Sequence, residues 1–274
     1  MTTRITEPPA ALASARTYRS VGFDNVLRSE WTKLRSLRST TVCGTLAVLT
    51  TIGLAIALGA RWAHQTPGTI QPGFDATNVS LSGVYIAQLI VGTLGAMTIS
   101  SEYTTGMIRA TFSAVPQRRA ILAAKALVLV SVTLVLAEIT CFVSFGICQA
   151  LLVHQHVGTS LSDPGVLRAV AGAGLYLGAI ALLGFGLGAT IRHTAGALST
   201  FFGILFAPSA LVDLLPTQLR NDIINYMPAN SGSQIFTIVR VHGSLSPWAG
   251  LGVFCLYVLA ALIAGFVLVG VRDA

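Results

Sequence analysis

The sequence predicts an all-α polytopic membrane protein, with six transmembrane helices preceded by an amphipathic helix in the membrane interface. Hydrophobic residues make up 53% of the 274 residues and charged residues only 10%, against about 25% in soluble globular proteins. Six stretches also reach the length of about 20 apolar residues that a helix needs to cross a bilayer. So few charges speak against a water-soluble enzyme, and so much apolar sequence speaks against a disordered chain.

The six expected spans account for about half of the chain. Five of them carry no charged residue once Arg168 is assigned to a loop. The chain therefore divides into an N-terminal cytoplasmic segment, residues 1–41, and a single six-helix transmembrane domain, residues 42–274. The expected spans are 42–60, 79–100, 120–153, 169–191, 194–212 and 247–270.

The distribution of basic residues predicts the orientation. Six spans place both termini on one side, and that side holds 12 of the 17 Lys and Arg residues. Because short cytoplasmic segments are enriched in Lys and Arg, both termini are expected in the cytoplasm. The Arg-, Ala- and Gly-rich composition favours a bacterial plasma membrane. The net charge of +7 follows this sidedness, so we expect a lipid bilayer and no nucleic acid as partner.

The segment before the first span predicts a short amphipathic helix. Its apolar residues recur at spacings of four, four and three, which is one face of a helix. A helix of this kind, with a Trp and basic residues, lies in the membrane interface. It either only anchors the first span or also contacts a cytoplasmic partner through its polar face. The apolar face holds Phe23, Leu27, Trp31 and Leu34, and the other faces hold Glu30, Lys33 and Arg35 among others.

A second helix is predicted on the cytoplasmic side, between the second and third spans. Gly106 ends or bends the second span, and residues 107–115 then form a short helix that Pro116 terminates. Its apolar side chains, beside Arg109, suit docking into a groove of another protein. A plain cytoplasmic hairpin is the alternative. The apolar side chains are Ile108, Phe112 and Val115.

The third expected span contains two charged residues and is longer than the membrane requires. Its 34 residues reach about 51 Å, against about 30 Å of hydrocarbon. The helix therefore tilts, or its first turns enter the cytoplasm, where Lys125 snorkels. Glu138 lies deep in the span, where a carboxylate costs about 2.5–3.5 kcal/mol. It either lines a pathway or is a structural residue, protonated or hydrogen-bonded, and it lies on nearly the opposite helical face from Lys125.

The remaining patterns concern packing. Gly174/Gly178 and Gly184/Gly188 are two G-x-x-x-G pairs in the fourth span, which favour close helix contacts. Residues 213–246 predict two short helices outside the membrane. The first is interrupted at Pro228, and the second starts with a capping box at residues 231–234.

Motifs of catalytic chemistry are missing from the sequence. It contains no phosphate-binding loop, no H-E-x-x-H and no paired carboxylates on one helix. The four cysteines all fall within spans, which indicates small apolar residues and not metal ligands. We therefore expect no catalytic residue, no metal and no cofactor bound by this chain.

Two motifs resemble type-2 ABC transporter permeases of the actinobacterial type. One is R-S-E-W-T-K-L-R-S at residues 28–36, before the first span. The other is S-E-Y-T-T-G-M-I-R-A-T at residues 101–111, followed by Val115-Pro116 and Arg118-Arg119. The order of the spans, the interfacial helix and the external segment resemble the same family along nearly the whole chain.

The resemblance implies the membrane subunit of an ATP-driven transporter, usually an exporter. In such a complex two permeases pair, either two copies or two paralogues, and two separate ATPase subunits hold ATP and Mg. The loop 101–119 then docks on the ATPase, with 107–115 as its coupling helix. The implied coupling residues are Glu102, Tyr103, Gly106, Met107, Ile108, Arg109, Phe112 and Pro116.

Two alternatives come from other functional classes. A self-sufficient carrier, driven by protons through Glu138, predicts transport without an ATPase and loss of activity in Glu138→Gln. The sequence offers little support for this carrier, because it contains one intramembrane carboxylate and no visible inverted repeat. A membrane-embedded enzyme needs a nucleophile, a base or metal ligands near one depth, and the sequence offers no such set.

Overall fold

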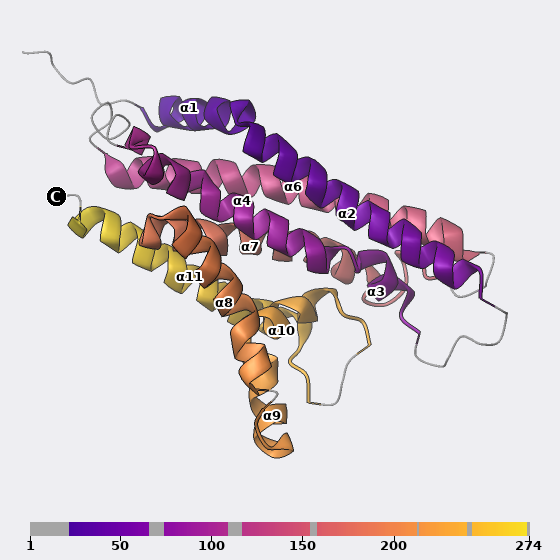
Figure 1. The fold of residues 1–274 in the computed structure, drawn as a ribbon. Helices are drawn as coiled ribbons and strands as arrows, with labels where there is room; N and C mark the ends of the chain where they lie inside the picture. The colour runs from indigo at the N-terminus through magenta and orange to yellow at the C-terminus, as the bar shows by residue number, and fades with distance from the viewer. Residues whose placement is uncertain are drawn as a thin grey trace, which may run out of the picture.

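The computed structural model describes residues 22–65, 74–108, 117–153, 158–212, 214–239 and 243–272, and within these ranges it contains helices and no strand (Figure 1). The helices are α1 (Phe23–Ser36), α2 (Arg38–Ala63), α3 (Ala76–Leu81), α4 (Val84–Thr104), α6 (Arg118–Leu152), α7 (Val166–Ile191), α8 (Thr194–Val212), α9 (Thr217–Ile223), η2 (Ile224–Tyr226), α10 (Pro228–Ser233), η3 (Gln234–Phe236) and α11 (Pro247–Arg272).

Six helical segments are long and apolar enough to cross a membrane, which confirms the predicted fold class. They are α2, α3 together with α4, α6, α7, α8 and α11. Helix α8 has the predicted bounds, whereas α2 already begins at Arg38. Helix α6 is a single helix of 35 residues, so the long third span is continuous.

Helix α7 is the centre of the bundle. Of its apolar stretch 78% is buried, against 22% for α2, α8 and α11. Glycines bring it into direct backbone contact with α4. A Cβ added at Gly184 would overlap the carbonyl oxygen of Gly92, and one added at Gly188 would overlap that of Ala96. The Gly184/Gly188 pair therefore packs as predicted, because small residues let two helix backbones approach closely.

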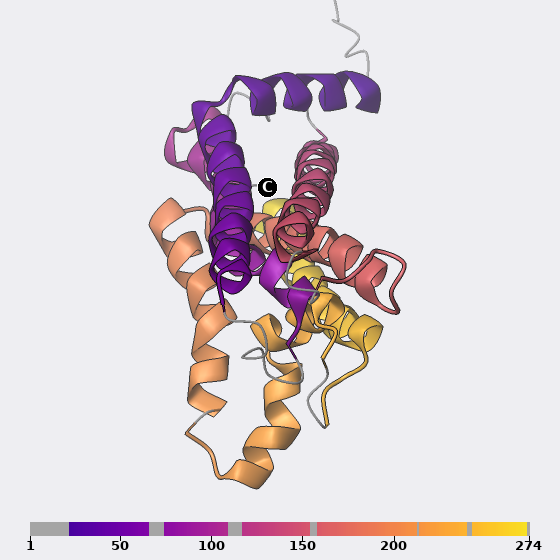
Figure 2. The ribbon, with the colours of Figure 1, turned by 90° about the vertical axis from the view of Figure 1, so that its right-hand side faces the viewer.

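Helix α1 lies across the ends of α2 and α6 (Figure 2). The last turn of α11 reaches the same end of the bundle (Figure 1). The buried residues of α1 recur every four positions and face the bundle. They are Val26, Glu30 and Leu34. Val26 packs on Ile121 and Ala124 at the start of α6.

The segment around α10 packs against α11, α8 and α7. Here the predicted capping box is wrong, because α10 begins at Pro228 and Ser231 lies inside it. The Ser231 hydroxyl donates to the carbonyl of Pro228 within this helix, whereas an N-cap serine would accept from a backbone N–H. Proline fits the first position of a helix, since the N–H it lacks has no helical partner there. Beneath the segment, Phe236 contacts Tyr176 of α7, with 5.5 Å between ring centroids.

The contact between α4 and α7 predicts opposite outcomes for two Gly→Ala changes. Gly184→Ala forces a methyl group into the backbone of α4, and overpacking of this kind costs about 1–3 kcal/mol. Gly203→Ala has open space around it and gains helix propensity of up to about 1 kcal/mol. In detergent, the thermal midpoint should fall for the first and hold or rise for the second. Equal midpoints would contradict the packing argument.

Candidate functional site

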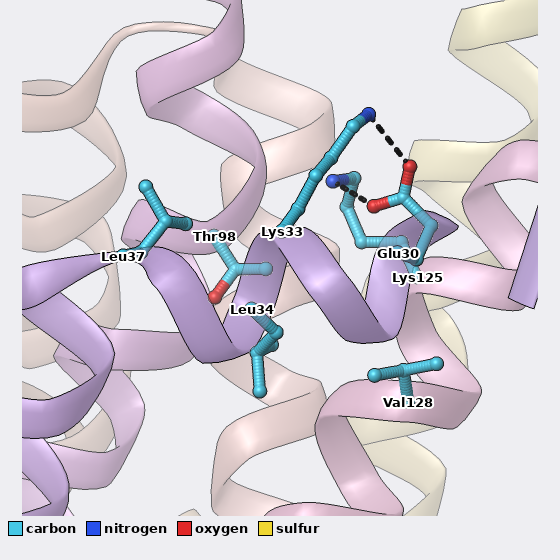
Figure 3. Close-up of a pocket in the computed structure, with 7 residues that line it drawn as sticks. All are labelled: Glu30, Lys33, Leu34, Leu37, Thr98, Lys125 and Val128. Atoms are coloured by element: carbon cyan, nitrogen blue, oxygen red, sulfur yellow. Dashed lines mark hydrogen bonds and ion pairs between the residues drawn. The ribbon is translucent and has the colours of Figure 1, made fainter. Parts of the chain in front are cut away.

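Four charged side chains meet where α1 crosses the ends of α4 and α6. We call Glu30, Lys33, Glu102 and Lys125 the ionic cluster. The Lys125 ammonium lies 2.5 Å from Glu30 Oε2 and 2.8 Å from Glu102 Oε1. Lys33 Nζ lies 2.8 Å from Glu30 Oε1 and 3.8 Å from Glu102 Oε1. Residues 95 positions apart, on α1 and α6, are thus joined by one hydrogen bond (Figure 3).

Burial gives these charges their energetic weight. The side chains of Glu30 and Lys125 are 3% and 4% exposed, and that of Glu102 is 12% exposed. A charge removed from water costs several kcal/mol unless a well-placed opposite charge compensates for it. Two carboxylates and two ammonium groups balance to no net charge. The cluster therefore fixes α1 to both α4 and α6.

The same surroundings act on the proton affinity of Glu30. Burial raises the pKa of its carboxyl, but the charge and hydrogen bond of Lys125, supported by Lys33, outweigh that effect. The pKa of Glu30 consequently lies below its usual value of 4.5. Glu30 is ionised at neutral pH, so its carboxylate can accept hydrogen bonds from both ammonium groups.

The space beside the cluster is too small for a substrate. Leu34, Leu37, Thr98 and Val128 line a cavity of about 10 Å³ next to the charged groups (Figure 3). That volume is close to the minimum that one water molecule needs. The arrangement can hold helices together, and a cavity of this volume does not enclose a transported molecule.

The predicted coupling residues begin at the cluster. Glu102 and Tyr103 lie in the last turn of α4, and Gly106 follows the helix with a φ of 73°, a left-handed conformation that favours glycine. Helix α4 ends as the sequence predicted. Met107 is 57% exposed, whereas Ile108 is buried. Arg109, Phe112 and Pro116, and with them most of the predicted coupling helix, lie outside the described residues.

The amphipathic helix exists as predicted in α1, but one charged residue, Glu30, lies on its packed face. Trp31 and Phe23, predicted on the apolar face, are 51% and 42% exposed, which is compatible with contact to the membrane interface. Glu30, placed on a polar face, is buried against the bundle together with Leu34. The error arises because a buried ion pair puts a charged residue on the packed face. Leu27 is partly buried, Lys33 is half-buried and Arg35 is exposed.

Lys125 belongs to the ionic cluster, whereas the sequence predicted only that its side chain snorkels from the third span. It does not snorkel into water as expected, because Glu30 and Glu102 neutralise it where it is buried. A single lysine inside an apolar span was the signal that a carboxylate on another helix had to be found.

Glu138 lies apart from the ionic cluster. Its carboxyl group is half-buried and packs against Gly174 of α7, where any added Cβ would overlap it. This contact explains the small residue at Gly174, the first member of a predicted G-x-x-x-G pair. No hydrogen bond or ion pair of this carboxylate occurs within the described ranges. A pathway role for Glu138 stays a prediction.

In the described part of the chain, no group of three His, Cys, Asp or Glu residues is placed so that it could hold a metal ion.

A protein-family model described as ABC-2 family transporter protein matches residues 26–207. The match covers about two thirds of the chain and includes the whole ionic cluster. A comparison with curated proteins gives no match.

The cluster predicts a large stability loss when Lys125 becomes Met. The change keeps an unbranched apolar stem but leaves Glu102 with only a 3.8 Å contact to Lys33. Breaking a buried pair in this way costs about 3–5 kcal/mol. The control is Lys33→Met, at a side chain that is 35% exposed, where about 0–1 kcal/mol is expected. Thermal unfolding in detergent distinguishes the two, and a Lys125→Met protein as stable as the wild type would contradict the assignment.

Acid should weaken the attachment of α1 to the bundle, because it protonates Glu30. A carboxyl whose pKa is lowered by folding stabilises the folded state above its usual pKa and loses that contribution as the pH falls. We therefore expect α1 to loosen as the pH drops below 4.5, the usual pKa of Glu30. Trp31 emission reports it in a protein that carries Trp62→Phe and Trp248→Phe. In Glu30→Gln the step should be absent, so coinciding titrations of the two proteins would refute the role of Glu30.

Proposed function

The chain belongs to the ABC-2 transporter family as a membrane-spanning permease subunit, and from that premise we propose that it works in an ATP-driven exporter of the bacterial plasma membrane. ABC-2 permeases work with ABC ATPase partners and do not themselves catalyse ATP hydrolysis. In the proposed complex, two separate ATPase subunits bind ATP and Mg²⁺. Two permeases, copies or paralogues, form the membrane part, with their termini in the cytoplasm.

The ATPase docks on the loop 101–119. This loop contains Arg109, Arg118 and Arg119, and basic residues favour the cytoplasmic side. Met107, directly after Gly106, is exposed, and the sequence predicts a short helix over residues 107–115. Apolar side chains beside an arginine on a short helix fit a groove of a partner protein.

The position of Glu102 carries the proposal. This carboxylate lies in the last turn of α4, directly before the loop, and its Oε1 is 2.8 Å from Lys125 Nζ on α6. Lys125 in turn holds Glu30 of α1. A docking event on the loop therefore acts on three helices at once, because its base is fixed to each of them by a buried charge.

Force on the loop then reaches the middle of the bundle. Helix α4 is in backbone contact with the central helix α7 at Gly92 and Gly184. A packed contact of this kind moves as a unit, because close-packed interiors transmit strain. ATP-driven closure of the ATPases would push the loop and tilt α4 and α7 together.

The test is an affinity pull-down of the tagged chain from native membranes in mild detergent, with mass spectrometry and an ATPase assay. We expect an ATPase with a phosphate-binding loop to co-purify. Arg109→Glu combined with Phe112→Ala should reduce its recovery at least about tenfold, since interface anchors contribute about 2 kcal/mol or more. The matched control is Arg61→Glu combined with Leu214→Ala, two exposed residues away from the loop, which should retain the ATPase.

The opposite result has a defined meaning. If the chain purifies without an ATPase and still moves a substrate in liposomes, the exporter proposal fails. Glu138→Gln then tests the proton-coupled alternative. If the ATPase is retained by the loop variant, the docking site lies elsewhere.

A further inference from the structure

The connection between α7 and α8 contains an unusual residue, Arg192. Its φ is 61°, the single positive value at a non-glycine residue in the part of the chain that the structure describes. It ends α7, with its backbone N–H donating to the carbonyl of Gly188. Left-handed backbone is unfavourable for a residue with a Cβ, and glycine would take this position without strain. Ending the helix therefore does not explain an arginine here.

The side chain of Arg192 connects two helices that meet at this end of the bundle. Its guanidinium carbon lies 5.0 Å from the centre of the Tyr103 ring, at the end of α4. One of its N–H groups donates to the carbonyl of Leu268 on α11 at 3.0 Å. A planar guanidinium can stack on an aromatic ring and donate in its own plane at the same time, which lysine cannot do.

Thr194, at the start of α8, holds the same turn of α4. Its hydroxyl lies 3.2 Å from the hydroxyl of Ser100 and 3.2 Å from that of Thr104. The last turn of α4 thus has two sets of contacts. Glu102 bonds to the ionic cluster on α1 and α6, and the neighbouring positions bond to the α7–α8 connection.

We propose that Arg192 is a positioning residue that transmits displacement of the loop base to the last span, α11. The inference deepens the proposed function, on which it rests. A push on the loop moves Tyr103, the guanidinium follows the ring, and the hydrogen bond to Leu268 draws the end of α11 along. Strained backbone conformations persist where the surrounding contacts hold them, and the contacts to Tyr103 and Leu268 contribute to holding this one.

The experiment compares hydrogen exchange in the purified complex of permease and co-purified ATPase, without nucleotide and with ATP plus vanadate. In the wild type, nucleotide should change exchange both in peptides covering 98–108 and in those covering 262–272. In Arg192→Gly the change at 98–108 should remain and that at 262–272 should be lost. Glycine suits the backbone conformation, so a merely structural role predicts a wild-type response from this variant.

Tyr103 supplies a matched pair. Tyr103→Phe keeps the ring and should keep the response of 262–272, whereas Tyr103→Leu should lose it. A response of 262–272 that survives in Arg192→Gly and Tyr103→Leu overturns the proposal. A complex without any nucleotide-dependent change at 98–108 would instead refute the proposed function, so the two failures are distinguishable.

Discussion

The arrangement of helices at one end of this protein depends on the burial of one ammonium group. Lys125 lies in a predominantly apolar stretch of α6 with 4% of its side chain exposed, a position that is unfavourable without compensating negative charge. Glu30 and Glu102 provide that charge, one from α1 and one from the end of α4. The orientation of α1 across the bundle and the packing of the last turn of α4 beside α6 therefore depend on the need to pair one residue of α6.

Deeper in the bundle, backbone contact replaces charge as the main constraint. Glycines on both sides allow α4 and α7 to touch along Gly92, Gly184 and Gly188, so these two helices form a close-packed unit. The ionic cluster lies at the end of α4, and the buried Tyr176, which contacts Phe236, lies in the middle part of α7. Tyr176 also donates a hydrogen bond to Gln88 of α4. Movement at the loop is consequently coupled along α4 and into the middle of α7.

Features that depend on local sequence could be predicted. Span length, the amphipathic helix and the stop at Gly106 are set by neighbouring residues, and the helices have nearly the expected bounds. Contacts between distant residues could not. Lys125 and Glu102 are 23 positions apart and Lys125 and Glu30 are 95 apart, and no periodicity links them. Glu30 was placed on the wrong face for the same reason, since hydrophobic pattern alone assigns every charge to solvent.

An apolar seam would hold α1 to the bundle equally well, because buried ion pairs are often no more stabilising than apolar residues of similar volume. The ionic cluster differs from an apolar seam because it prevents α1 from sliding along α6. Sliding α1 by about one turn would bring Val26 or Leu34 to the place of Glu30, which leaves Lys125 with a single carboxylate. An apolar seam would tolerate that shift, because Val and Leu pack against similar surfaces. The cluster thus fixes the register of α1 against α6, and with it the position of Glu102 at the base of the loop that follows.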